Sequence, residues 1–306
     1  MTMELIRSAA YDSPARVEEP ARPPLRVGLV QHRWREDAAE LREVLFDGIA
    51  RAAGAGARAV FLPELTLSRY PAFEAPAGRP AEAAEDIETG PTVAFAAEAA
   101  KRHGILVHAS LYERTDLGDG LGYNTAVLVD PAGAVIAKTR KTHIPVTEGY
   151  VEDKYFRPGP ADGAYPVHEA LEARFGLPTC WDQWFPEVAR LYALGGADIL
   201  VYPTAIGSEP DHPDFDTQPL WQQVIIGNAI ANGLFMVVPN RTGDEGLISF
   251  YGSSFIADPY GRVLAQAPRD AEAVLVADLD LDQRGDWLTL FPFLRTRRPD
   301  TYGGLA

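Results

Sequence analysis

The sequence predicts a single α/β domain, and three observations lead to this prediction. Short apolar runs typical of buried strands alternate with longer segments whose apolar residues recur every three or four positions, as on one face of a helix. The alternation continues along the 306 residues, and no linker, internal repeat or low-complexity tract interrupts it. Hydrophobic residues make up 46% of the chain, which is enough for a large core. We therefore expect a mixed sheet, or two sheets sandwiched between helices.

The elements of the N-terminal half follow one another in a regular order. Residues 1–24 mix charged residues with prolines, so we expect an irregular N-terminal arm, which could pack across a neighbouring subunit, ahead of one domain at 25–306. The segment from Glu64 to Thr89 is rich in proline and alanine and long enough to suggest a functional lid. The expected strands are 25–30, 58–62, 105–110, 124–130 and 134–141, and the expected helices are 37–53 and 90–103.

The C-terminal half repeats this order after an irregular stretch at 145–163. Pro186 suits the first turn of a helix, where a missing N–H costs nothing, and Gly195 with Gly196 ends that helix. The turn at 258–261 joins two strands into a hairpin. The expected strands are 165–168, 171–179, 198–202, 234–239, 251–258, 263–266 and 273–279, and the expected helices are 186–194 and 217–232.

Composition excludes several classes of partner. The net charge of −15 argues against nucleic acid and anionic membranes. No apolar run approaches the ~20 residues needed to cross a bilayer, and the first 24 residues have no apolar core like that of a signal peptide. A single cysteine excludes an intrachain disulfide and a multi-cysteine metal site, and it fits a reducing cytosol. We therefore expect a cytoplasmic protein that acts on a small molecule.

Three chemically able side chains lie where predicted strands end. Glu64, Lys141 and Cys180 supply a carboxylate base, a cation and a sulfur nucleophile, a complete set for acyl transfer. The carboxyl edge of an open α/β sheet is where ligands bind. Each residue also has a structural explanation when taken alone, namely a turn cap, a surface base and a core cysteine. Cys180 lies between a strand and the helix at 186–194, and a helix dipole there would lower the thiol pKa.

The sequence around each of these residues resembles the nitrilase superfamily of carbon–nitrogen hydrolases. The segments are Phe-Leu-Pro-Glu-Leu around Glu64, Arg-Lys-Thr-His-Ile-Pro around Lys141 and Cys-Trp-Asp-Gln-Trp-Phe-Pro-Glu from Cys180, in an order that spans about residues 25 to 300. The resemblance implies a four-layer α-β-β-α sandwich with mixed sheets. It also implies a homodimer formed through the Cys-bearing face, or a larger oligomer, and a Glu-Lys-Cys triad without metal or organic cofactor.

Three further segments are similar to the N-carbamoylputrescine amidases of this superfamily, which implies hydrolysis of an N-carbamoyl amine to amine, carbon dioxide and ammonia. Glu152 falls where these enzymes have a second active-site glutamate. The chain departs from them in its N-terminal arm, in residues 211–220, which could shape the substrate pocket, and near Asp286. The similar segments are 149–159, 202–210 and 250–257, with 297–302 as the closing segment.

The expected substrate contacts favour a carbamoylated diamine. Relatives that hydrolyse carbamoyl amino acids tend to carry an arginine three residues after the cysteine, whereas Gln183 has no charge to bind a carboxylate. Glu209, with Asp211 or Asp214, could bind a terminal ammonium. An apolar slot for the methylene chain could be lined by aromatic side chains: Trp181, Trp184, Tyr150 and Tyr70.

Other functions stay open at this point. The same triad could serve a β-ureidopropionase, another aliphatic amidase or a nitrilase. An inactive scaffold is disfavoured because Glu64, Lys141 and Cys180 are all present. A nucleotide-binding domain ranks last, since the sequence has neither a dinucleotide-binding glycine motif nor a P-loop.

Overall fold

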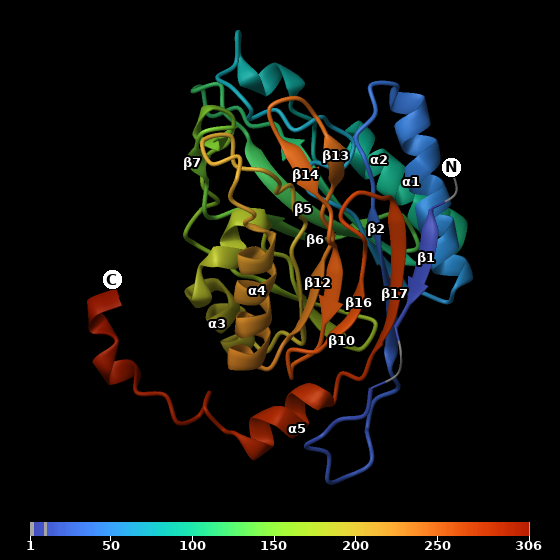
Figure 1. The fold of residues 1–306 in the computed structure, drawn as a ribbon, viewed down its shortest axis with the longest axis vertical. Helices are drawn as coiled ribbons and strands as arrows, with labels where there is room; N and C mark the ends of the chain where they lie inside the picture. The colour runs from blue at the N-terminus through green and yellow to red at the C-terminus, as the bar shows by residue number, and fades with distance from the viewer. Residues whose placement is uncertain (1–2, 9–10, 306) are drawn as a thin grey trace.

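Two β-sheets lie face to face in the computed structural model, which describes residues 3–8 and 11–305 (Figure 1). The larger sheet has seven strands in the order β1-β17-β2-β3-β4-β5-β6. Strands β2, β3 and β4 are parallel, and β6 runs in the same direction as β4 because two antiparallel pairings separate them. Its strands are β1 Glu4–Arg7, β2 Leu25–Gln31, β3 Ala59–Phe61, β4 Leu106–Glu113, β5 Tyr123–Val129, β6 Val135–Arg140 and β17 Ala273–Leu279.

The second sheet has six strands in the order β16-β15-β12-β11-β10-β9. Strands β10, β11 and β12 are parallel, so their carboxyl ends also meet at one edge. Two small ribbons, β7 Val146–Thr147 with β8 Tyr150–Val151 and β13 Thr242–Asp244 with β14 Ser249–Tyr251, lie outside both sheets. The six strands are β9 Val167–Ala170, β10 Ala173–Gly176, β11 Ile199–Val201, β12 Phe235–Val238, β15 Phe255–Ala257 and β16 Val263–Gln266.

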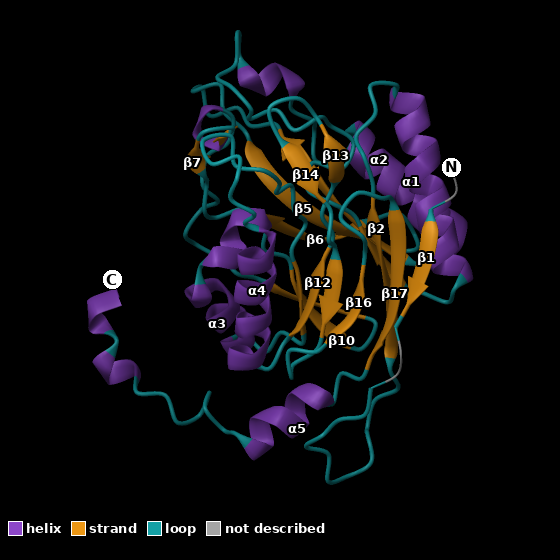
Figure 2. Cartoon of the chain, in the orientation of Figure 1, coloured by secondary structure: helices purple, strands orange, loops and turns teal. Residues whose placement is uncertain are grey.

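Helices cover the outer face of each sheet, which confirms the four-layer α-β-β-α sandwich (Figure 2). Helices α1 (Ala38–Gly54) and α2 (Pro91–His103) pack on the seven-stranded sheet, and α3 (Pro186–Leu194) and α4 (Gln218–Asn232) pack on the six-stranded sheet. Helix α5 (Gln283–Leu290) follows the last strand, and the chain from there to the C-terminus extends away from the sheets (Figure 1).

Alternation along β2 shows how one strand serves two cores. Val27 and Leu29 point into the core between the sheets, while Val30 contributes to the core under α1 and α2. Strand side chains point alternately to opposite faces, so a strand covered on both sides must be apolar at nearly every position. Burying each large aliphatic side chain contributes about 1.5–3 kcal/mol. Asp37 accepts hydrogen bonds from two backbone N–H groups of the first turn of α1 and fixes where that helix begins.

The structure corrects four expectations about the elements. Glu4–Arg7 is not irregular, because it forms β1 and pairs in parallel with β17; residues 1–2 and 9–10 of the expected arm lie outside the described residues. The strand expected at 251–258 is interrupted at Gly252 and Ser253, both with positive φ, so Tyr251 belongs to β14 and β15 begins at Phe255. The strand expected at 171–179 ends at Gly176. Helix α5 was not expected, since few of its residues are buried.

No helix in the described part of the chain is both long and apolar enough to span a membrane.

Candidate active site

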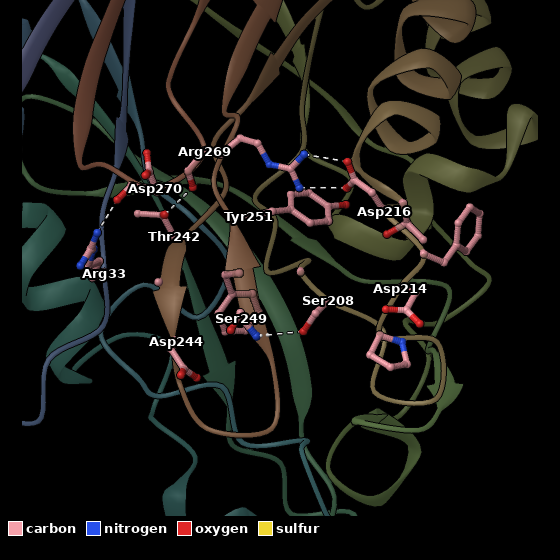
Figure 3. A pocket seen from close by; sticks show the side chains of 16 residues that line it. Arg33, Ser208, Asp214, Asp216, Thr242, Asp244, Ser249, Tyr251, Arg269 and Asp270 are labelled. Carbon is pink, nitrogen blue, oxygen red and sulfur yellow. Dashed lines mark hydrogen bonds and ion pairs between the residues drawn. The ribbon is translucent and has the colours of Figure 1, made fainter.

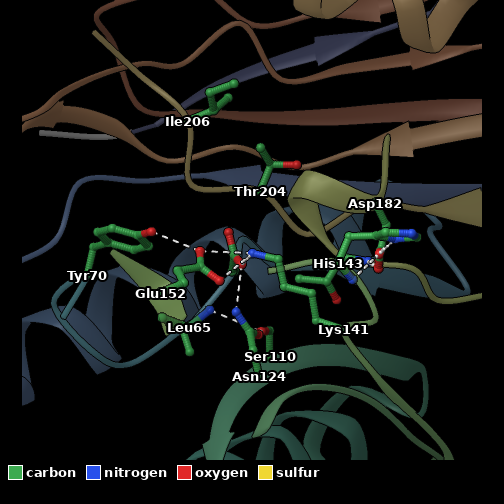
Figure 4. A network of polar contacts seen from close by, with 12 residues as sticks. Leu65, Tyr70, Ser110, Asn124, Lys141, His143, Glu152, Asp182, Thr204 and Ile206 are labelled. Atoms are coloured by element: carbon green, nitrogen blue, oxygen red, sulfur yellow. Dashed lines mark hydrogen bonds and ion pairs between the residues drawn. The ribbon is translucent and has the colours of Figure 1, made fainter. Parts of the chain in front are cut away.

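The ammonium group of Lys141 lies between two carboxylates at the carboxyl edge of the seven-stranded sheet. Its Nζ is 2.9 Å from Glu64 Oε1 and 2.7 Å from Glu152 Oε2, and all three side chains are buried (Figure 4). Burial lowers the pKa of Lys141, but the charges of Glu152 and Glu64 outweigh it and raise the pKa above its ordinary value. Lys141 therefore stays positively charged in the interior, where it can stabilise a second negative charge.

Glu64 has one anchored oxygen and one free oxygen. It comes three residues after the end of β3, and its Oε1 accepts hydrogen bonds from Lys141 Nζ and, at 2.7 Å, from Asn124 Nδ2. Asn124 is the second residue of β5, and its carbonyl accepts the backbone N–H of Lys141 at 2.8 Å. Within the described residues, the buried Oε2 of Glu64 has no hydrogen-bond partner. This oxygen can accept a proton without breaking an existing contact.

Glu152 has both oxygens engaged. Lys141 Nζ contacts Oε1 at 2.9 Å and Oε2 at 2.7 Å, and the hydroxyl of Tyr70 donates to Oε1 at 2.8 Å (Figure 4). Burial raises the pKa of Glu152 to about 7; Lys141 lowers it and the nearby charge of Glu64 raises it further. Glu152 is therefore a carboxylate that holds Lys141 and titrates near neutral pH.

Cys180 begins a short 3₁₀-helix, Cys180–Trp184, in a strained conformation. Its φ is 40°, a left-handed value that costs a residue with a side chain roughly 1–3 kcal/mol. The strained turn is held by a hydrogen bond from the Cys180 N–H to the carbonyl of Pro203 at 3.0 Å. Only 6% of the residue is exposed.

The expectation of a lowered thiol pKa at Cys180 is wrong. Burial and the charge of Glu64 raise the pKa of the thiol well above its usual range, and Lys141 only partly offsets them. Helix α3 begins at Pro186, beyond the 3₁₀-helix, and the influence of a helix dipole is confined to its first turn. The resting thiol is therefore protonated, and a neighbouring base is needed to make it a nucleophile.

Asp182 connects the segment after Lys141 to the 3₁₀-helix that carries Cys180. Its carboxylate accepts hydrogen bonds from the Thr142 hydroxyl at 2.7 Å, the His143 N–H at 2.9 Å and the Thr179 N–H at 3.0 Å. The imidazole of His143 also contacts Asp182 and stacks on Phe185 with 3.7 Å between ring centroids. His143 therefore contacts, through its backbone N–H and its ring, a carboxylate that holds the two segments together.

The 3₁₀-helix that begins at Cys180 carries two further polar groups, the backbone N–H of Trp181 and the side-chain amide of Gln183. The backbone N–H of Trp181 donates to no protein atom in the described residues, so it remains able to bind an oxyanion. Gln183 lies in the same 3₁₀-helix, three residues after Cys180. The Gln183 amide is completely buried, and neither its oxygen nor its nitrogen has a partner in the described part of the chain.

A pocket of about 710 Å³ is lined by residues of the β13–β14 ribbon and of the segment before α4, and none of Glu64, Lys141, Glu152 and Cys180 lines it (Figure 3). One of its lining residues, Gly207, donates its N–H to the hydroxyl of the buried Tyr150 at 3.1 Å. Burial raises the pKa of Tyr150, and the charges of Glu209 and Cys180 add to it, so this ring lies near both. The charged side chains that line the pocket are Arg33, Asp214, Asp216, Asp244, Arg269 and Asp270.

Glu209 lies between that pocket and Tyr150. It is half-buried, and its Oε1 accepts a hydrogen bond from the hydroxyl of Thr217, a pocket residue, at 3.2 Å. Burial raises the pKa of Glu209. Of the two aspartates expected beside it, Asp214 lines the pocket and Asp211 is exposed outside it.

The structure thus brings together Glu64, Lys141, Glu152 and Cys180, and it gives Tyr70 a contact with Glu152 rather than a place that only lines a slot. Trp181 and Trp184 are partly buried neighbours with ring centroids 6.3 Å apart. In the described residues, no group of three or more His, Cys, Asp and Glu side chains is placed to hold a metal ion. The sequence analysis missed four residues that support the site: Asn124, Asp182, Arg241 and Glu245.

Comparisons with known proteins place this chain among carbon–nitrogen hydrolases. The sequence profile described as carbon-nitrogen hydrolase matches residues 26–288. A citrullinase from Francisella tularensis is 37% identical over 91% of this chain and 96% of its own length, and an N-carbamoylputrescine amidase from Arabidopsis thaliana is 40% identical over 72% of this chain and 74% of its own.

Among solved structures, a carbon-nitrogen hydrolase from Helicobacter pylori superposes with a TM-score of 0.79 at 31% identity, covering 92% of this chain and 98% of that one. A mutant amidase from Nesterenkonia sp. AN1, in which acrylamide has added to the active-site cysteine, superposes with a TM-score of 0.73 at 25% identity, covering 92% of this chain and 100% of that one.

Proposed function

The chain belongs to the carbon–nitrogen hydrolase family and is a hydrolase of carbon–nitrogen bonds, and we propose that it cleaves the ureido group of an N-carbamoyl amine. The other end of this substrate carries a positive charge, and N-carbamoylputrescine is the first candidate. The observation that carries this proposal is the half-buried carboxylate of Glu209. It accepts a hydrogen bond from Thr217, and no lysine or arginine in the described residues forms an ion pair with it. An alkylammonium group would supply the missing charge.

The first half of the proposed reaction uses the free oxygen of Glu64. Glu64 Oε2 takes the thiol proton as Cys180 Sγ bonds to the ureido carbon. The new oxyanion lies against Lys141 and the N–H of Trp181, and a donor of this kind typically contributes about 100- to 1,000-fold in rate. Glu64 returns the proton to the amino group, the C–NH₂ bond breaks and ammonia leaves. Cys180 is left as a carbamoyl thioester that still carries the amine.

The second half adds water to the thioester. Glu64 accepts a proton from the water as its oxygen bonds to the carbonyl carbon, and the proton returns to sulfur when the C–S bond breaks. The released carbamate decomposes to carbon dioxide and the free amine. Glu152 keeps Lys141 in place through both halves, and no metal or organic cofactor takes part.

Citrulline is a second candidate substrate, because the same pocket offers arginines as well as carboxylates. Citrulline carries a ureido group with both an ammonium and a carboxylate at its far end, and Arg33 and Arg269 line the pocket with its aspartates. The relative that matches 91% of this chain is named citrullinase. N-carbamoyl-β-alanine, with a carboxylate alone, is the weaker alternative, since it has no ammonium group to pair with Glu209.

We also infer a homodimer or larger homo-oligomer. Apolar side chains are exposed on the outer helices of the Cys-bearing half, among them Leu191 and Leu194 of α3 and Leu220 of α4, each 45–49% exposed. A second copy of the chain would cover them. Light scattering on the purified protein would test this, and a monomer at micromolar concentration would contradict it.

The decisive experiment measures ammonia release from N-carbamoylputrescine, citrulline and N-carbamoyl-β-alanine, with Cys180→Ala as the blank. We expect the putrescine compound to be preferred, and Glu209→Gln to raise its KM by about tenfold, since a paired charge-assisted hydrogen bond is lost. Preference for citrulline would favour the second candidate. Release from none of the three above the blank would contradict ureido hydrolysis.

A further inference from the structure

Arg241 connects the two sheets at the edge where the reaction centre lies. It follows β12 in the six-stranded sheet, whereas its partners belong to the turn after β3 in the seven-stranded sheet. The side chain is completely buried and contacts neither Cys180 nor the Glu64 carboxylate. A buried guanidinium is costly to desolvate, so its place in the fold needs an explanation.

One nitrogen of Arg241 binds the turn that carries Glu64. Its Nη2 donates to the carbonyl oxygens of Glu64 at 3.1 Å, Leu65 at 2.9 Å and Ser68 at 2.8 Å. Leu65 has a φ of 50°, a left-handed conformation that a leucine adopts only when its surroundings impose it. Arg241 is therefore part of what holds Glu64 in its orientation.

The other nitrogen of Arg241 reaches the second carboxylate through two intermediates. Its Nη1 donates to Glu245 Oε1 at 2.7 Å, and Glu245 Oε2 accepts the backbone N–H of Tyr70 at 3.1 Å. The hydroxyl of Tyr70 in turn donates to Glu152 Oε1 at 2.8 Å. Binding the turn after β3 and binding Glu245 at the same time needs the two terminal nitrogens of a planar guanidinium group. The single ammonium group of a lysine does not provide them.

We propose that Arg241 is a positioning residue that sets where Glu64 and Glu152 lie on either side of Lys141. Glu64 and Lys141 come from the seven-stranded sheet and Cys180 from the six-stranded sheet, so the distance from base to nucleophile depends on how the sheets are held at this edge. Arg241 and Asp182 are ties across that edge, one for Glu64 and one for Lys141. The inference deepens the proposed function, because it concerns the same reaction centre.

The test compares Arg241→Lys with a matched control, Arg262→Lys. Both arginines form an ion pair with a carboxylate four residues away, Arg241 with Glu245 at 2.7 Å and Arg262 with Asp258 at 2.6 Å, but Arg262 lies at the β15–β16 turn. For Arg241→Lys we expect kcat to fall about 10- to 100-fold with KM within about threefold, since a catalytic group displaced by 1 Å can cost that much. The control should keep both constants.

A second readout needs no substrate. Cys180 is the only cysteine in the sequence, so alkylation by iodoacetamide as a function of pH reports its titration alone. The charge of Glu64 raises the pKa of this thiol. In Arg241→Lys we expect the Glu64 carboxylate to move away from Cys180, so the pH midpoint of alkylation should be lower. The other titratable groups near the thiol are Lys141, Glu152, Tyr70, Tyr150 and Tyr251, so the readout is the difference between the midpoints of variant and wild type, both of which contain these groups. His32, buried beside Arg241, has a pKa lowered to about 4 and stays neutral.

Glu245→Gln is a second variant that tests the proposal even if Arg241→Lys does not fold. It leaves Arg241 in place but weakens the link to Tyr70, so a smaller fall in kcat at constant KM is expected. The proposal is overturned if a folded Arg241→Lys protein keeps the wild-type kcat and the wild-type alkylation midpoint. If wild type hydrolyses no ureido compound, the proposed function fails, while the alkylation midpoints of wild type, Arg241→Lys and Arg262→Lys still decide the positioning role.

Discussion

Glu64 and Glu152 contact the same ammonium group, yet their surroundings differ in one respect. Glu64 uses Oε1 for Lys141 and Asn124 and leaves Oε2 without a partner in the described residues. Glu152 uses both oxygens for Lys141 and Tyr70. A carboxylate with a free oxygen can take up a proton, whereas one with both oxygens engaged would lose a hydrogen bond in doing so. Two buried glutamates on one ammonium group thus differ in their contacts, and we expect this difference to make Glu64 the base and Glu152 the positioning group.

The largest expected effect comes from removing the base. Glu64→Gln keeps the shape of the side chain, and its amide can still face Lys141, but it cannot accept the thiol proton. Because a positioned general base contributes typically 10²–10⁴-fold, we expect kcat/KM for the preferred substrate to fall about 1,000-fold or more. Steady-state ammonia release measures it.

Glu85→Gln is the matched control for that variant. Glu85 is a partly buried carboxylate whose pKa is raised by burial, and it accepts hydrogen bonds from the N–H and hydroxyl of Thr92 at the start of α2. Its loss should lower thermal stability and leave kcat/KM unchanged. Equal losses of activity in the two variants would contradict the assignment of Glu64 as the base.

Glu152→Gln tests the other half of the comparison. Lys141 keeps its contact with Glu64 but loses its closest charged partner, so the oxyanion site loosens while the base remains. We expect kcat to fall about 100-fold, the scale of a misplaced catalytic group, with thermal stability measured in parallel. Asp153→Asn, at the adjacent and more exposed carboxylate, should change neither quantity. A loss as large as that of Glu64→Gln would mean that Glu152 also transfers protons.

The smallest expected effect comes from Tyr70→Phe. The hydroxyl of Tyr70 donates to Glu152 and lowers its pKa, so removing it should raise that pKa above the present value of about 7. As the pH falls, Glu152 would then become protonated at a higher pH than in the wild type. The acidic limb of the kcat profile should therefore move to higher pH. At pH 8 we expect kcat to fall only about threefold to tenfold, the scale of one hydrogen bond to a charged group. An unchanged limb would show that Glu152 does not control it.

Residue patterns located the parts of the site that follow strands directly. Glu64, Lys141 and Cys180 were found because each lies at the end of a predicted strand, and β3, β6 and β10 do end before them. The same rule could have pointed to Arg241, which comes three residues after the end of β12, but an arginine in a loop carries no sign that it will be buried. Asn124 and Asp182 gave no signal, because an amide at a strand start and an aspartate in a turn are both common.

The sequence by itself determined the order of most strands and helices and the strand ends near which Glu64, Lys141 and Cys180 lie, because periodicity and strand ends are local properties. The four-layer sandwich and the Glu-Lys-Cys set were implied by the resemblance to the nitrilase superfamily. The tertiary structure decided how these side chains behave. Burial beside Glu64 raised the thiol pKa of Cys180, where a helix start had predicted the opposite. Tyr70 became a partner of Glu152, and Arg241 became a tie between sheets. Desolvation and hydrogen-bond partners depend on residues distant in sequence, so only the folded chain fixes them.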